Sequence, residues 1–487
     1  MALILILSPL VMAALAFAVP SNRLRPWLIP IAAVCHTAVT LIVLFDPALR
    51  VFSRSLVLDP TGSVVLLSTS VLYFLTSFYA VGFLKLRMER SNRIFTSCLL
   101  ASLGLITLVC WSHDLGITWV AIEGTTLVMA PLVYFKRTPQ SIEATWKYLL
   151  VGSVGIALAL LGTFFLAYAS LQGGFGATMN FDDLRAGAGT LSKPWLRAAF
   201  ILFLVGYGTK MGLAPMHNWK PDAYGEAPGL VGAIFAGGVT SAAFLTLTRI
   251  YQICLPAGEG AFMSRLLLFM GLVSMAVAGV FMVRQHDIKR LLAYSSVEHM
   301  GILVLGLGIG GPALSGTLFH LVANAMTKGI LFLSAGNIQR AYASKNTGFV
   351  TGALRRLPLS GGLFLTGFIA ITGSPPFAPF ISEFSILSGA FSAGLYAVGA
   401  CFAIFLLVVF IGMGSTVLRV VFGPEPAASG STAGGAANGA ALRYRDTFLT
   451  VAPSFAFLAI ILALGVWLPA PLGELFASAA RFLENVR

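Results

Sequence analysis

Ionisable side chains lie inside several long apolar stretches of this 487-residue sequence, where they could carry protons or ions. A charged side chain at the centre of a membrane helix costs about 2.5–3.5 kcal/mol on insertion scales, and such residues commonly mark ion or proton pathways. We therefore predict an intramembrane proton relay. Its expected members are Glu123, Lys210, His320, Lys328 and Glu383, and the further candidates are Lys147, His217, Ser241, Glu298, His299 and Asn324.

Glu123 and Lys210 are natural partners, because they carry opposite charge and each lies within an apolar run. In a low-dielectric interior the pair would hold both groups charged, and a proton arriving nearby would weaken the pair and make Lys210 easier to deprotonate. Such a pair would form an electrostatic switch. The alternative is a static, structural ion pair.

His320, Asn324 and Lys328 are spaced i, i+4, i+8, so they lie on one stripe of a helix. A polar stripe on an otherwise apolar helix suits water-mediated proton hopping, and histidine titrates near neutral pH. A lone histidine would more often be a satisfied core residue, but three polar residues in register favour a relay. Glu383 is the predicted terminal acid of this row.

Three of the further candidates also have a simpler structural interpretation. Glu298 and His299 are expected to open their helix close to a cytoplasmic loop, where they would cap or anchor it. Lys147 is expected near a helix start, from which its amine could reach water while its stem stays in the apolar region.

The composition excludes a water-soluble fold, because 57% of the residues are hydrophobic and only 10% are charged, against roughly a quarter charged in soluble domains. The net charge of +13 is attributed to basic loops, so we expect lipid and no nucleic acid as a partner. The five cysteines lie singly, without a C-x-x-C pair, which argues against an iron–sulfur or zinc site. No nucleophile–base triad is present. We expect no cofactor, no metal and no catalytic residue.

Apolar runs of membrane-spanning length predict an all-α integral membrane protein with about fourteen transmembrane helices. The expected spans are 2–19, 27–45, 62–84, 94–112, 114–134, 145–171, 195–213, 228–250, 266–283, 291–309, 313–335, 358–391, 394–422 and 446–470. Loops after odd-numbered spans hold 19 Lys and Arg residues, and loops after even-numbered spans hold 7. The excess predicts that odd-numbered loops are cytoplasmic and that both termini face the other side of the membrane. The expected location is a bacterial inner membrane, in which these termini would be periplasmic.

Prolines interrupt two of these spans, the seventh at Pro215 and the twelfth at Pro375 and Pro376. Proline removes a backbone hydrogen bond, and in lipid only protein or internal water can replace it. A matching pair of breaks in two halves is typical of inverted-repeat transporters, although two kinked core helices are the alternative. We expect inverted five-helix repeats of helices 4–8 and 9–13. The predicted divisions are 1–93 (helices 1–3), 94–250, 251–423, a flexible cytoplasmic loop at 424–445, and 446–487 (helix 14 and tail).

Three longer motifs resemble those of a known family. They are Lys210 with residues 215–228 (PMHNWKPDAYGEAP), residues 287–301 (DIKRLLAYSSVEHMG) and residues 328–337 (KGILFLSAGN). Together they resemble signatures of the antiporter-like proton-translocating subunits of respiratory complex I and membrane-bound hydrogenases. Residues 143–149 (EATWKYL), 297–300 (VEHM) and 371–377 (ITGSPPF) resemble the hydrogenase-4 component F branch, and the similarity spans roughly residues 60–420.

The resemblance implies a fourteen-helix fold whose two inverted repeats each offer a half-channel. By motif match, Glu123 and Lys210 take the paired positions of the fifth and seventh helices. His320 and Lys328 take the eleventh-helix relay, and Glu383 the twelfth-helix terminal group. The chain would then be a non-catalytic subunit that moves protons or sodium ions, next to other membrane subunits and, through them, a hydrophilic electron-transfer arm.

The sequence departs from the family pattern at three positions. Tyr224 stands where histidine is expected, and Lys220 stands where leucine is usual. Ser241 falls where some members carry an eighth-helix lysine that links the two half-channels. Water, or another side chain such as His217, would then have to bridge them.

Two alternative functions use the same fold. The chain could belong to a multisubunit cation/proton antiporter without a redox module, or to the membrane component of an energy-coupled carbon dioxide hydration complex. A purely structural membrane anchor is a further alternative, which the ordered polar stripe argues against.

Overall fold

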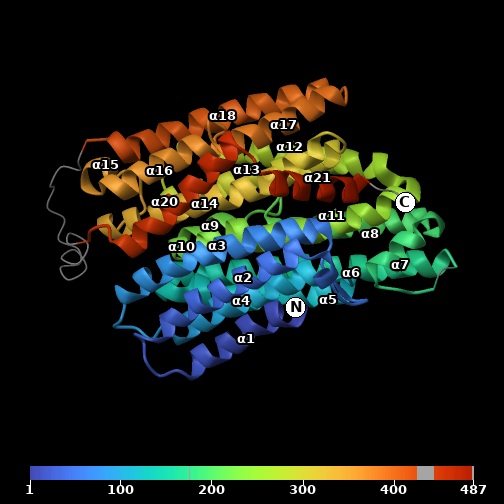
Figure 1. Ribbon diagram of the computed structural model, residues 1–487. Coiled ribbons are helices and arrows are strands. Elements are labelled where there is room, and N and C mark those ends of the chain that lie inside the picture. Colours follow the sequence, from blue (N-terminus) through green and yellow to red (C-terminus); the bar gives the residue numbers. More distant parts are fainter. Residues whose placement is uncertain (175, 425–443, 485–487) are drawn as a thin grey trace.

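The computed structural model describes residues 1–174, 176–424 and 444–484, which form a helical bundle with one short hairpin (Figure 1). The first long helices are α1 (Ala2–Ala18), α2 (Leu28–Phe45) and α3 (Pro60–Lys85), and the antiparallel hairpin β1 (Val51–Ser53) and β2 (Leu56–Val57) lies between α2 and α3. The next helices are α4 (Arg93–Trp111), α5 (Leu115–Val133), α6 (Pro139–Gln172), α7 (Phe181–Ala186), α8 (Lys193–Met211), α9 (Trp219–Glu226), α10 (Gly229–Ile234) and α11 (Thr240–Cys254).

The second half of the chain repeats this alternation of long and interrupted helices. It contains α12 (Gly260–Met282), α13 (Ile288–Ile309), α14 (Ala313–Tyr342), α15 (Ala353–Arg356), α16 (Pro358–Ile371), α17 (Ala378–Ser392), α18 (Tyr396–Phe422), α20 (Phe448–Val466) and α21 (Ala470–Glu484). Short 3₁₀ or π segments lie at Arg25–Trp27, Pro47–Arg50, Tyr134–Lys136, Ala188–Thr190, Phe235–Val239 and Leu255–Glu259.

Helix α14 is at the centre of the bundle. It packs against α3, α10, α13, α16, α17, α20 and α21, and Figure 1 shows α1 and α18 at opposite edges. Outer helices instead expose apolar side chains, such as Leu407 and Ile411 on α18, as helices facing lipid do. Polar side chains on α14 between Thr317 and Asn337 are buried from water and lipid, so they need partners inside the protein.

The predicted fold class is confirmed. Among the described residues, ten helices are long and apolar enough to cross a membrane, and a helix or an interrupted helix lies over each of the fourteen expected ranges. The count of fourteen crossings and the division into repeats stay predictions. Most of the low-complexity segment 424–445 lies outside the described residues.

Both predicted helix breaks are present, and each contains a glycine with positive φ. α8 ends at Met211, and Gly212 follows with φ +76° before the segment that holds Pro215. α16 ends at Ile371, and Gly373 with φ +67° precedes Pro375 and Pro376. Positive φ is inexpensive only for glycine, so a glycine at each break lets the chain leave the helix sharply.

Helix α13 begins earlier than the sequence predicted, which corrects the interpretation of Glu298. Asp287 caps the helix by accepting hydrogen bonds from the backbone of Lys289 at 2.8 Å and Arg290 at 3.1 Å. The charged run 287–290 therefore belongs to the helix start rather than to a loop. Glu298 and His299 consequently lie near the middle of α13 and are buried, so they do not cap or anchor it.

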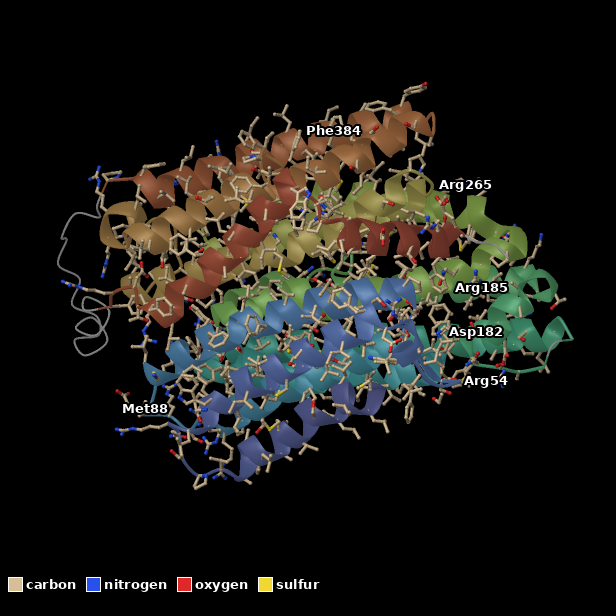
Figure 2. All side chains as sticks on the ribbon, viewed as in Figure 1. Arg54, Met88, Asp182, Arg185, Arg265 and Phe384 are labelled. Carbon is tan, nitrogen blue, oxygen red and sulfur yellow. The ribbon has the colours of Figure 1, made fainter. Side chains whose placement is uncertain are left out.

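Loops expected on opposite membrane sides lie at opposite ends of the bundle. Figure 2 shows Met88, in the loop after α3, at one end and Arg54, Asp182 and Arg185 at the other. This is the alternation expected of a chain that crosses a membrane repeatedly.

Candidate functional site

Among the described residues, four lysine side chains are buried inside the bundle, on α8, α9, α13 and α14. They are 1% exposed at Lys210 and 0% exposed at Lys220, Lys289 and Lys328. A buried amine needs hydrogen-bond partners, because an unpaired one is costly in an apolar interior. The sequence prediction included Lys210 and Lys328 but missed Lys220 and Lys289, which it counted as loop residues. For Lys220 a signal existed, since leucine is usual at its motif position.

Thr126 lies between Glu123 and Lys210. Lys210 Nζ donates to Thr126 Oγ1 at 2.6 Å, and Thr126 Oγ1 donates to Glu123 Oε2 at 3.0 Å. Glu123 and Lys210 are thus partners through a hydroxyl rather than in direct contact. Thr126 follows Glu123 by three residues on α5, so both side chains lie on one face of that helix.

Two hydroxyls of α6 complete this group of residues. Ser153 donates to Glu123 Oε1 at 3.0 Å, and Tyr148 accepts from Lys210 Nζ at 3.2 Å. A hydroxyl both donates and accepts, so each can pass a proton between its neighbours. We call Glu123, Thr126, Tyr148, Ser153 and Lys210 the first cluster.

Lys328 on α14 is held by α13. Its Nζ donates to Ser295 Oγ at 2.6 Å, and it interacts electrostatically with the buried carboxyl of Glu298. Ser295 and Glu298 are three residues apart, on one face of α13. The amide of Asn324, one turn before Lys328, is buried and has no hydrogen-bond partner among the described residues. Such an amide is a typical position for an ordered water molecule.

His299 on α13 and His320 on α14 are hydrogen-bonded ring to ring. His299 Nδ1 lies 3.0 Å from His320 Nε2, and His320 Nδ1 lies 2.9 Å from Ser382 Oγ on α17. Because Ser382 Oγ donates its proton to Pro379 O at 2.8 Å, it accepts from His320 Nδ1. Neutral His320 is then an acceptor at Nε2, and His299 donates to it from Nδ1. His299 Nε2 is left as an acceptor, 3.8 Å from Glu298 Oε2.

Glu383 folds back onto the second helix break. A Cβ at Gly373 would overlap Glu383 Oε2, so only glycine leaves room for this carboxyl group. Glu383 is 4% exposed, and its Oε1 has no hydrogen-bond partner among the described residues. We call Ser295, Glu298, His299, His320, Lys328, Ser382 and Glu383 the second cluster.

His299, His320 and Glu383 could also be considered as metal ligands. One ligand atom from each lies within 4.8 Å of the others. However, the bond between the two imidazoles uses one ring nitrogen of each, and His320 Nδ1 is bonded to Ser382. A hydrogen-bonded pair of this kind is arranged to pass protons rather than to share a cation.

Lys147 lies at the surface, away from both clusters. It forms ion pairs with Glu143 at 2.6 Å and with Asp222 at 2.9 Å, and Asp222 also contacts Arg290. The side chain of Lys147 is 47% exposed. Lys147 therefore links α6 to α9 through an ion pair and belongs to neither cluster.

Among the described residues, neither Ser241 nor His217 is hydrogen-bonded to a member of either cluster. Ser241 Oγ donates to Gly237 O at 2.9 Å, within its own helical segment. His217 is half-buried, with its ring 6.3 Å from Phe281 and 6.0 Å from Tyr294. The hydroxyl is turned to its own backbone and the imidazole to an aromatic pair.

A separate buried ion pair supports the start of α3. Arg249 Nε donates to Asp59 Oδ2 at 2.7 Å, and the same guanidinium donates to Val109 O and Cys110 O. Burial alone would raise the pKa of Asp59, but Arg249 and hydrogen bonds from Thr61 and Gly62 hold it below its usual value. Because each nitrogen of the guanidinium has a hydrogen-bond partner within the protein, we interpret this pair as structural.

The family model described as "NADH:quinone oxidoreductase/Mrp antiporter, TM" matches residues 112–411 of this chain. A similar protein is the hydrogenase-4 component F homolog of Methylacidiphilum infernorum (isolate V4). It is 33% identical over 495 residues, which cover 98% of this chain and 99% of the relative.

Two solved structures show the same fold. One is a chain of the membrane-bound sulfane sulfur reductase, an archaeal respiratory membrane complex, with a TM-score of 0.86 at 21% identity over 100% of this chain and 98% of the other. The second is a chain of the Mrp complex from Dietzia sp. DQ12-45-1b, with a TM-score of 0.85 at 21% identity over 99% of this chain and 97% of the other.

Proposed function

This chain belongs to the NADH:quinone oxidoreductase/Mrp antiporter transmembrane family as an antiporter-like membrane subunit, and we propose that it moves protons through the two clusters. The complex would be a hydrogenase-4-like or complex I-like oxidoreductase. Other membrane subunits and a hydrophilic arm would carry out the electron transfer, and this chain would couple that energy to ion movement.

The observation that carries the proposal is the chain of hydrogen bonds in the second cluster. A proton that reaches His299 Nε2 allows His299 Nδ1 to release its own proton to His320 Nε2, and His320 Nδ1 then becomes the next donor. Glu298 lies beside His299, and Glu383 lies next to both histidines. Two carboxyl groups thus lie beside a histidine pair, and a proton can pass along this pair while it stays inside the protein.

The side chains favour a proton over a sodium ion. Sodium needs several oxygen ligands, whereas an ammonium group offers donors only. Lys210 and Lys328 lie within the two clusters, so their charged forms would repel a metal cation in a low-dielectric interior. A proton, by contrast, can be bound by every amine, carboxyl and imidazole group of the two clusters.

The chain is a multi-pass integral membrane protein, and we place it in the inner membrane of a bacterium with both termini periplasmic. The excess of Lys and Arg in odd-numbered loops supports this orientation. Loops of the two sets lie at opposite ends of the bundle (Figure 2). Arg25, Lys220, Lys289 and Arg249 are counted as loop residues but are buried; without them the odd-numbered loops still hold more Lys and Arg than the even-numbered loops.

The test is proton pumping in inverted membrane vesicles from the native host, read with a pH-sensitive fluorescent dye. The variants are Lys210→Ala and Glu383→Gln, each normalised to the amount of assembled complex. We expect both to assemble and to lose acidification, while the redox reaction of the partner subunits remains measurable. Unchanged acidification in both variants would contradict the proposal and leave an anchoring role. Sodium-dependent acidification that needs no redox substrate would favour a cation/proton antiporter instead.

A further inference from the structure

The two clusters need a connection. The amine of the first cluster is Lys210, which is bonded to Thr126. The amine of the second cluster is Lys328, which is bonded to Ser295. Ser241 takes the place of the linking lysine and bonds its own helical backbone, and His217, the side chain expected to bridge, packs against Tyr294. Lys220 is the remaining buried amine of the break segment, and its side chain is completely enclosed.

Lys220 Nζ is hydrogen-bonded to two backbone oxygens, each belonging to a residue that directly follows a cluster member. It donates to Met211 O at 2.6 Å, and Met211 directly follows Lys210. It also donates to Ser296 O at 3.2 Å, and Ser296 directly follows Ser295, the hydroxyl partner of Lys328. One amine therefore bridges the end of α8 and the middle of α13, each within one residue of a cluster member.

Lys220 and Glu383 occupy comparable places at the two helix breaks. A Cβ at Gly212 would lie 2.5 Å from Lys220 Cδ and 3.2 Å from its Nζ, and a Cβ at Gly373 would overlap the carboxyl group of Glu383. In each break, an ionisable side chain from the second half-helix folds back over the positive-φ glycine. At the second break that side chain is Glu383, which the proposed function already places in the relay.

Two departures from the family pattern contact each other here. Lys220 Nζ lies 5.6 Å from the centroid of the Tyr224 ring, one turn further along α9. A tyrosine face attracts an ammonium group, so the ring stabilises the charged form of the lysine without fixing it as a carboxylate would. Lys220 and Tyr224 thus form one local unit.

We propose that Lys220 is the proton-carrying group that joins the two clusters, a role that rests on the proposed function. Neutral Lys220 would accept a proton from the Lys210 side, and its ammonium form would pass one proton to the Lys328 side, through water where the amines do not touch. Each transfer breaks one N–H bond and forms another, so no co-reactant is needed. The same transfers in reverse order would move protons from the Lys328 side to the Lys210 side.

A static role predicts different behaviour. Lysine can also cap the C-terminus of a helix, and Met211 is the last residue of α8. In that case any residue that restores the cap would suffice. Lys220→Arg keeps charge and donors but cannot release its proton near neutral pH, whereas Lys220→Leu removes both.

The experiment measures acidification per unit of redox activity in the same vesicles for Lys220→Arg, Lys220→Leu and the double variant Lys220→Leu with Ser241→Lys. We expect both single variants to lose about tenfold or more, as for a proton-transfer group. The double variant should regain a large part of the activity, because it returns an ionisable amine to the link from a different helix. Lys289→Leu removes another buried lysine–carbonyl bond, from Lys289 Nζ to Ala227 O at 2.7 Å, and serves as the control for assembly.

The outcomes separate this inference from the proposed function. If Lys220→Arg pumps normally, or if the double variant assembles but stays inactive, Lys220 is structural and the inference fails. The proposed function still stands in that case, provided that Lys210→Ala and Glu383→Gln lose pumping. If those two variants also pump normally, the proposed function itself is overturned.

Discussion

His299 Nδ1 lies 3.0 Å from His320 Nε2, and the two residues come from neighbouring helices, α13 and α14. The bond is directional, because Ser382 donates its own proton to Pro379 O and so forces His320 to donate from Nδ1. The direction of both imidazole hydrogen bonds in the second cluster thus follows from one serine hydroxyl. A proton transferred along the pair reverses these bonds, so the pair must reset before the next transfer.

The histidine pair predicts a loss of pumping for His320→Gln. Glutamine fills a similar volume and can form hydrogen bonds, but it cannot accept a proton near neutral pH. We expect acidification by assembled complexes to fall by about tenfold or more. The matched control is His36→Asn, since His36 is also buried and bonded to two hydroxyls, those of Thr107 and Ser70, but lies on α2. Equal losses in both variants would show a general packing effect instead.

The hydroxyl between Glu123 and Lys210 predicts a large effect of Thr126→Val. Valine has nearly the same shape but removes the group that accepts from Lys210 and donates to Glu123. We expect assembly to be retained and pumping to fall by about tenfold or more. In the control Thr125→Val, the lost hydroxyl bonds only the backbone oxygen of Ile122, at 2.6 Å. Normal pumping in Thr126→Val would mean that the two charges act without the hydroxyl.

The second helix break predicts a specific effect of Gly373→Ala. A methyl group there would overlap Glu383 Oε2, in addition to the strain of about 1–2 kcal/mol that positive φ imposes on alanine. Gly394→Ala carries the same backbone strain at φ +74°, with no atom within 4 Å of the new methyl group. We expect Gly373→Ala to lose acidification and Gly394→Ala to retain it. Equal pumping in the two variants would show that the position of the Glu383 carboxyl group is unimportant.

The buried pair of Asp59 and Arg249 predicts a stability effect rather than a functional one. Removing one partner with Asp59→Asn leaves a buried guanidinium uncompensated, which typically costs about 3–5 kcal/mol. The check is thermal unfolding of the detergent-solubilised protein, with the exposed Asp46→Asn as the control. A melting temperature equal to that of the wild type would contradict this assignment.

The same pair predicts how stability changes in acid. The folded protein holds the pKa of Asp59 below its usual value of about 4. This contribution to stability is therefore complete above that usual value and is lost as the pH falls through the lower, folded-state pKa. We expect the melting temperature of the wild type to fall below about pH 4, with a smaller fall over this range in Asp59→Asn. Parallel curves for the two proteins would refute the linkage.

The sequence by itself determined the class of the protein and the positions of the breaks, and it supplied most of the residues that we propose as the relay. Apolar run length is a local property, and so is the loss of a backbone hydrogen bond at Pro215 or Pro375. The cost of charge in lipid likewise marks Lys210, Lys328 and Glu383 without knowledge of their neighbours.

Only the tertiary structure decided which groups meet. Thr126 lies between Glu123 and Lys210, and His299 on α13 lies within hydrogen-bond distance of His320 on α14. Lys220 was assigned to a loop, yet its amine is buried between α8 and α13. Distances between side chains on different helices depend on how each helix is rotated and crossed against its neighbours, and an almost uniformly apolar sequence carries little information about that rotation.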